Sequence, residues 1–108
     1  MEYIGKLEYD CALKDNETDI VIFGAGAAVH NILDKMEIEG IKRKVVSICD
    51  NNSEKCPDYI DGIKVISFKQ ANELYHDARF IIYNKYVVDI AKQLIKEEIN
   101  NIHYILLT

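Results

Sequence analysis

The chain has 108 residues, of which 49% are apolar and 29% charged, and its formal net charge is −5. This length is enough for one domain with one hydrophobic core and too short for a second catalytic domain. The acidic balance argues against general nucleic-acid binding, which needs a basic surface. No apolar run approaches the ~18 residues that cross a membrane, and residues 1–10 lack the apolar core of a signal peptide. We therefore expect a cytoplasmic protein without a nucleic-acid or membrane partner.

The three cysteines are Cys11, Cys49 and Cys56. Because no secretory signal precedes them, we expect reduced thiols rather than disulfides. A metal pair formed by Cys49 and Cys56 is the alternative, but their spacing matches no common zinc-ligand pattern. The sequence therefore predicts no metal site.

The first 17 residues carry apolar side chains at helical spacing, at Tyr3, Ile4, Leu7 and Cys11. This pattern predicts a short amphipathic helix that packs on the edge of a sheet. A partly ordered linker is the alternative. In both cases residues 1–17 precede the main domain, which we expect to span residues 18–108.

A strand, a glycine turn and a helix follow in direct succession. The expected strand 19–23, with its apolar run 20–23, meets Gly24 and Gly26. Apolar side chains then recur three and four apart, at Val29, Ile32, Leu33 and Met36. This succession predicts a buried parallel strand and an amphipathic helix that ends near Gly40. Such a turn presents backbone N–H groups to a phosphate.

A second apolar strand, residues 45–49, ends at Asp50 and Asn51. Strand, helix and strand in this spacing predict a βαβ crossover. In dinucleotide-binding folds, the carboxylate that accepts hydrogen bonds from a ribose lies ~20 residues after the glycine turn. The distance from the glycine turn to Asp50 is close to this spacing. Val29 stands where the G-x-G-x-x-G pattern has its third glycine, so we expect the helix to be pushed outward or tilted.

The remaining elements are predicted by turn and cap signals. Asp61-Gly62 between two isoleucines predicts a hairpin that leads into a strand over 64–66. Ser67 and Gln70 form a capping box for a helix over 68–75. A strand over 79–83 follows, then a helix capped by Asn84 with Val87, Ala91, Leu94 and Ile95 on its apolar face, and a last strand over 102–107.

Together these elements predict an α/β fold, a Rossmann-like doubly wound parallel sheet of order 3-2-1-4-5 with helices on both faces. In such sheets ligands bind outside the carboxyl ends of the strands, where the strand order reverses. Three loops should therefore converge on one crevice, and these are residues 24–28, 50–53 and 83–85.

Three motifs carry a family resemblance, namely Gly24-Ala25-Gly26, Asp50-Asn51 and the hairpin segment 61–65. With their flanking segments they resemble the Rossmann-like domains of bacterial polysaccharide biosynthesis. The chain is similar to the N-terminal domain of PglD-type sugar O-acyltransferases and to the nucleotide-binding domain of CapD-like nucleotide-sugar epimerases and dehydratases. The resemblance covers about residues 18–107 and does not include an acyltransferase β-helix or an epimerase catalytic domain.

The resemblance implies a nucleotide or nucleotide-sugar site that takes NAD or a UDP-sugar. Asp50 would accept hydrogen bonds from ribose hydroxyls, and Asn51 would donate to the base or ribose. Asn84 and Lys85, at the start of the last helix, complete the expected site, because Lys85 could reach a diphosphate there. The alternatives are helix capping or loop solvation for Asp50 and a solvated surface position for Lys85. The backbone N–H groups implied to face the phosphates are those of Gly24, Ala25, Gly26, Ala27 and Ala28.

Three functions are compatible with this pattern. The first is a nucleotide-binding domain related to polysaccharide biosynthesis whose catalysis is supplied by a partner chain. The second is a small NAD-dependent oxidoreductase or epimerase that modifies sugars and is completed by oligomerisation. There His30, in the first helical turn, is either a base or a surface histidine. The third is a degenerate Rossmann scaffold without a ligand.

Overall fold

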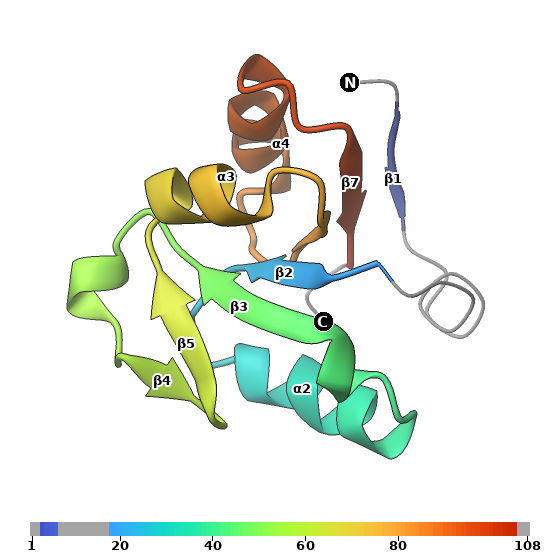
Figure 1. Cartoon of the computed structure of the whole chain (residues 1–108), viewed down its shortest axis with the longest axis vertical. Coiled ribbons are helices and arrows are strands. Elements are labelled where there is room, and N and C mark those ends of the chain that lie inside the picture. Colours follow the sequence, from blue (N-terminus) through green and yellow to red (C-terminus); the bar gives the residue numbers. More distant parts are fainter. Residues whose placement is uncertain (1–2, 7–17, 106–108) are drawn as a thin grey trace.

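The computed structural model describes residues 3–6 and 18–105, which form a mixed α/β fold with helices on both faces of a mostly parallel sheet (Figure 1). In chain order its strands are β1 (Tyr3–Lys6), β2 (Ile20–Phe23), β3 (Val45–Cys49), β4 (Tyr59–Ile60), β5 (Ile63–Ile66), β6 (Arg79–Ile82) and β7 (Asn101–Tyr104). The helices are α2 (Val29–Ile38), α3 (Phe68–Tyr75) and α4 (Val87–Lys96), with short 3₁₀ turns η1 (Lys42–Lys44) and η2 (Ser53–Lys55).

Within the described residues, the strands form one sheet in the order β1-β7-β6-β2-β3-β5-β4. Every pairing is parallel except that between β4 and β5. The glycine turn follows β2, which lies between β3 and β6. The carboxyl ends of these three strands therefore meet at one edge of the sheet.

Two edge strands lie outside the expected five-strand order, and one of them, β4, belongs to the expected hairpin. The five-strand order 3-2-1-4-5 is incomplete, because β1 and β4 extend the two sides. The prediction of a helix over residues 1–17 is wrong for Tyr3–Lys6, because this segment forms a strand parallel to β7. The rest of that expected helix, residues 7–17 with Cys11, lies outside the described residues, as does the end of the expected last strand, residues 106–107.

Helices cover both faces of the sheet (Figure 1), and each face has its own apolar core. On one face lies α2, whose buried side chains are those predicted from the sequence, Val29, Ile32, Leu33 and Met36. On the other face lie α3 and α4, which pack over the two buried phenylalanines of the sheet, Phe23 and Phe80. Between these layers, every residue of β2 and β6 is buried. This pattern is typical of parallel strands that are covered on both faces.

Local signals define the middle of the chain as expected. Asp61 and Gly62 both adopt positive φ, 51° and 80°, between the antiparallel strands β4 and β5, which is the conformation of a two-residue hairpin turn. Ser67 forms the expected capping box with Gln70, and α3 begins at the next residue. Because these elements depend on neighbouring residues alone, the sequence predicts them directly.

The buried face of α4 differs from the expected one by a rotation about the helix axis. Ile90, Ala91 and Leu94 are buried, whereas Ile95 is 41% exposed. The helix has no side-chain cap of its own, and its N-cap residue is Tyr86. Asn84 accepts instead from the backbone N–H of Tyr86, at 2.8 Å, and so stabilises the bend that leads into α4.

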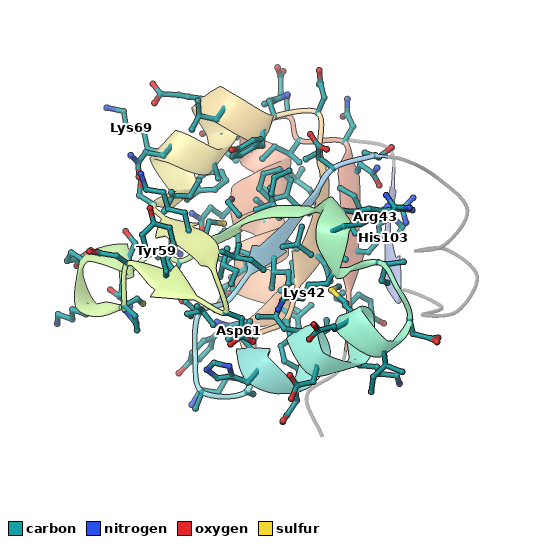
Figure 2. All side chains as sticks on the ribbon, turned by 60° about the horizontal axis from the view of Figure 1, so that its bottom comes forward. Lys42, Arg43, Tyr59, Asp61, Lys69 and His103 are labelled. Atoms are coloured by element: carbon teal, nitrogen blue, oxygen red, sulfur yellow. The ribbon has the colours of Figure 1, made fainter. Side chains whose placement is uncertain are left out.

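We expect Ser67→Ala to lower the free energy of unfolding by about 1 kcal/mol, because the Gln70 backbone N–H loses its acceptor. Urea denaturation followed by circular dichroism measures this change. The control is Lys69→Ala, because Lys69 is exposed and lies two residues after Ser67 (Figure 2). This substitution should change the free energy of unfolding by less than about 0.5 kcal/mol. Equal effects of the two substitutions would contradict a role for the capping box.

Candidate functional site

The glycine turn is held between the ends of two neighbouring strands. The Gly24 N–H donates to the Cys49 carbonyl oxygen of β3 at 2.9 Å, and the Tyr83 N–H donates to the Phe23 carbonyl oxygen at 3.0 Å. The loops that follow β2, β3 and β6 are therefore fixed against one another. This arrangement brings together the three loops that the sequence predicts to converge.

The two glycines of the turn have different structural roles. Gly24 has φ of +138°, and a Cβ atom at this position would collide with the Tyr83 carbonyl oxygen. A side chain at Gly26 would meet no atom within 4 Å, and Gly26 is exposed. Gly24 is therefore required by the packing of the turn against β6, whereas the folded chain itself has room for a side chain at Gly26.

The Asp50 carboxylate connects the glycine turn to its own loop. Its Oδ2 atom accepts from the Ala25 N–H at 2.9 Å, and its Oδ1 atom accepts from the Asn52 N–H at 2.8 Å. The N–H groups of Gly24 and Ala25 thus have acceptors within the chain. Each carboxylate oxygen can accept a further hydrogen bond, so the half-buried Asp50 keeps capacity for a hydroxyl donor.

Asn51 forms a reciprocal amide pair with Gln93 of α4. Asn51 Nδ2 donates to Gln93 Oε1 at 2.9 Å, and Gln93 Nε2 donates to Asn51 Oδ1 at 2.8 Å. The Asn51 side chain, which the resemblance implies to contact a base or ribose, therefore links the loop after β3 to α4. Gln93 is a site residue beyond those predicted from the sequence, and its one sequence signal is a spacing of four residues from Asp89, which places both on one side of α4.

Two adjoining cavities lie where these loops meet. One, of about 330 Å³, is lined by the β3 loop and α4 and includes Asp50, Asn51, Asp89 and Gln93. The other, of about 260 Å³, is lined by the residues before α2 and after β6, including Gly26, Ala27, Ala28 and Lys85. Asn84 and Tyr86 line both cavities. Seven of the nine expected site residues thus surround one composite site, and buried Gly24 and Ala25 support it from beneath.

The smaller cavity offers hydrogen-bond donors and positive charge. Within the described part of the chain, no hydrogen-bond acceptor is found for the N–H groups of Gly26, Ala27 and Ala28. These groups precede α2, whose first turn carries no acidic side chain, so the helix dipole favours an anion there. Lys85 Nζ lies 5.2 Å from the centroid of the Tyr86 ring. Because both residues line the smaller cavity, this contact keeps a positive charge beside it.

Val29, which replaces the third glycine of the dinucleotide pattern, is only 1% exposed and packs in the core beneath α2. Its neighbour His30 is largely exposed, and its Nδ1 atom lies 3.5 Å from Asp61 Oδ2. Asp61 belongs to the hairpin turn and lies beside α2 (Figure 2). His30 therefore joins α2 to the β4–β5 hairpin.

Neither described cysteine is a poised nucleophile. Cys49 and Cys56 are free thiols. Burial, reinforced by the nearby Asp50 carboxylate, raises the pKa of both, Cys49 more strongly. Both thiols are therefore protonated at neutral pH. Within the described residues, no group of three or more His, Cys, Asp and Glu side chains is placed to hold a metal ion.

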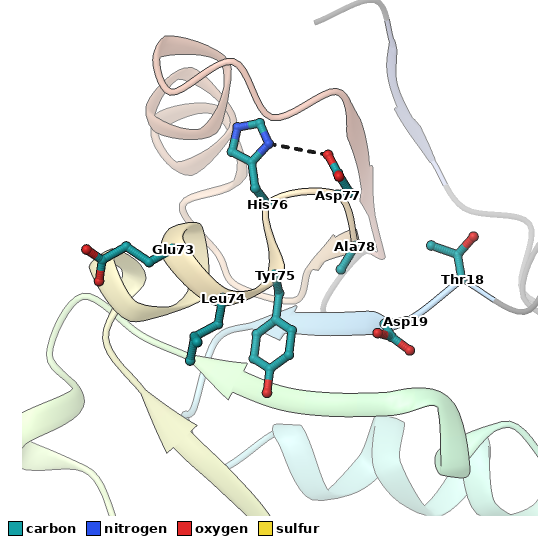
Figure 3. Close-up of a pocket in the computed structure, with 8 residues that line it drawn as sticks. All are labelled: Thr18, Asp19, Glu73, Leu74, Tyr75, His76, Asp77 and Ala78. Carbon is teal, nitrogen blue, oxygen red and sulfur yellow. Dashed lines mark ion pairs between the residues drawn. The ribbon is translucent and has the colours of Figure 1, made fainter.

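A cavity of about 480 Å³ lies at the other end of β2, beside Thr18 and Asp19 and the end of α3 (Figure 3). Among its described lining residues is His76, which lies 3.5 Å from Asp77 and 3.1 Å from the Glu97 carbonyl oxygen. The cavity is larger than either single cavity of the composite site, but it adjoins the amino ends of the strands. It shares no residue with the glycine turn, and its carboxylates disfavour an anionic ligand.

We expect Gly24→Ala to lower the free energy of unfolding by at least about 2 kcal/mol, because the added methyl collides with the Tyr83 carbonyl oxygen in a strained backbone conformation. Gly40→Ala is the matched control, since Gly40 has φ of +78° but open space around it. The control should cost only about 1 kcal/mol. Urea denaturation distinguishes the two, and a smaller effect at Gly24 than at Gly40 would show that the collision is relieved.

Asp50→Ala should lower the free energy of unfolding by about 2 kcal/mol, because two backbone N–H groups lose a charged acceptor. Thermal and urea denaturation both report this loss. Asp58→Ala, at an exposed carboxylate in a nearby loop, should change stability by less than about 0.5 kcal/mol. If both variants are equally stable, Asp50 does not hold the turn.

Comparison with known proteins identifies a family. The family model described as C2185-like, N-terminal, matches residues 16–105, and the chain therefore belongs to this family. No curated protein and no solved structure matches the chain. Within residues 3–6 and 18–105, no helix has the length and apolar character needed to cross a membrane.

Proposed function

We propose that this member of the C2185-like, N-terminal family is a Rossmann-like domain that binds a nucleotide, either a nucleotide-sugar or NAD, at the composite site. In this proposal the domain supplies binding, and a partner chain related to polysaccharide biosynthesis supplies catalysis. The cytoplasmic location stays a prediction.

One observation carries the proposal. Gly26, Ala27 and Ala28, which precede α2, line one cavity together with Lys85. Backbone donors at a helix N-terminus together with a lysine suit a phosphate, since the donors point along the helix dipole and the lysine adds a full charge. A diphosphate is the anionic group common to NAD and UDP-sugars.

The order of the strands supports the Rossmann-like assignment. The parallel strands run β5-β3-β2-β6-β7, and the direction of chain progression reverses between β2 and β6. Ligands of open α/β sheets bind outside the carboxyl ends of strands at such a reversal. The composite site lies at that place, next to the ends of β2, β3 and β6.

Gly26 provides independent support. No neighbouring atom and no positive φ explains a glycine there. A glycine in a phosphate-binding turn lets the ligand approach the backbone closely. The open space at Gly26 is therefore consistent with space for a ligand, and its substitution separates binding from folding.

A thermal-shift panel with NAD, NADP, UDP-sugars and CoA tests the proposal. A ligand at one hundred times its Kd adds about 2.7 kcal/mol of stability, which corresponds to a rise in Tm on the order of 10 °C for a domain of this size. We expect NAD or a UDP-sugar to raise the Tm, and NADP to be disfavoured because its 2′-phosphate would meet Asp50. If no compound raises the Tm at millimolar concentration, the proposal is wrong.

Two variants then locate the site. Gly26→Ala should keep the stability of the parent chain and weaken binding of the active ligand, because the methyl occupies ligand space. Lys85→Ala should weaken binding roughly tenfold through loss of a charged contact, whereas Lys69→Ala on α3 serves as the charge-matched control and should have no effect. Isothermal titration calorimetry measures each Kd. Unchanged binding in both site variants would place the ligand elsewhere.

A further inference from the structure

The cavity beside α4 differs chemically from the one beside α2. Its described lining residues include two carboxylates, Asp50 and Asp89, and no lysine, arginine or histidine. An anionic group would therefore be repelled there. The phosphate-suited donors all line the other cavity, on the far side of Asn84.

The same lining suits a group that carries several hydroxyls. Carboxylate oxygens accept hydrogen bonds from hydroxyl donors, and side-chain amides both donate and accept. Asp89 and Gln93 lie one helical turn apart on α4, and Asn84 adds a third polar side chain. Tyr86, which is 58% exposed, adds an apolar ring against which the carbon-bound hydrogens of a sugar ring can pack.

The dimensions and the connection between the two cavities agree with one extended ligand. A cavity of about 330 Å³ lies at the small end of the range for ligand pockets, roughly 300–1,000 Å³, and so suits a single ring. Because Asn84 and Tyr86 line both cavities, a ligand that crosses them would have an anionic part on the α2 side and a neutral polar part on the α4 side.

We infer that the cavity beside α4 receives a sugar ring that is joined to the diphosphate, and that Asp89 is a specificity-determining residue that accepts hydrogen bonds from its hydroxyls. This inference rests on the proposed function, because the diphosphate is held by the Gly26–Ala28 turn and Lys85. The ring is either the ribose of the nucleotide or a hexose attached to the diphosphate. The chemistry at Asp89 is the same for both.

Calorimetric titration with three probes tests the inference: inorganic pyrophosphate, UDP and UDP-glucose. Asp89→Asn keeps the shape of the side chain but removes its charge, and we expect it to weaken UDP-glucose on the order of tenfold. Pyrophosphate binding should be unchanged or slightly stronger. If a hexose occupies the cavity, UDP is unaffected, and if ribose occupies it, UDP weakens equally. Asp34→Asn, at an exposed position of α2, is the control and should alter none of the three.

Side-chain amide signals in nuclear magnetic resonance spectra give a second measurement that needs no variant. A sugar ring in the cavity should shift the side-chain amide signals of Gln93, which lines only the cavity beside α4, when UDP-glucose is added but not when pyrophosphate is added.

The outcomes separate the inference from the proposed function. Loss of pyrophosphate affinity in Asp89→Asn, or no effect on any probe, would overturn the inference and leave nucleotide binding in place. If the parent chain binds none of the three probes and does not bind NAD, the proposed function is wrong, and the inference with it.

Discussion

The close approach of the Gly24 backbone to the Tyr83 carbonyl oxygen determines the geometry of the site. Only a residue without a Cβ can occupy this position at φ of +138°. This contact brings the loop after β2 against the end of β6, and the Gly24 N–H joins the same loop to β3. The cavities on either side of Asn84 depend on this three-way junction.

Side chains then add a second level of restraint around the junction. Asp50 accepts a hydrogen bond from the Ala25 N–H of the glycine turn. The hydrogen bonds between Asn51 and Gln93 then hold the loop after β3 against α4. Residues expected to contact a ligand directly therefore also hold the walls of the composite site in place. A substitution at Asp50 or Asn51 changes the shape of the site as well as its chemistry, so Gly26 and Asp89 are better probes of binding.

The sequence predicts those parts of the fold that depend on neighbouring residues. The α3 capping box and the Asp61-Gly62 hairpin are confirmed because each is determined within four residues, and the buried face of α2 follows from helical periodicity. The strand β1 was missed because apolar spacing in residues 1–11 matches a helix, whereas its pairing with β7 depends on a distant segment. In α4, Ile90 and Ile95 compete for the buried face, and only packing against the sheet decides between them.

The candidate site follows the same division. The convergence of three loops could be predicted, because the carboxyl ends of parallel strands share one edge of a sheet. The amide pair between Asn51 and Gln93 could not, because 42 residues separate its members. The location of Asp89 and Tyr86 at the cavity could not be predicted either, because it depends on the rotation of α4 about its axis.

The pairing of β1 with β7 has a consequence for the order of folding. Among the described elements β1 is synthesised first, yet its partner strand is synthesised last. The sheet from β2 to β6 can therefore form on the emerging chain while β1 still has no partner, and its docking closes one of the longest loops in the chain. Contacts of such sequence separation form slowly. The edge of β7 thus stays open to other strands until the chain's own amino-terminal strand covers it.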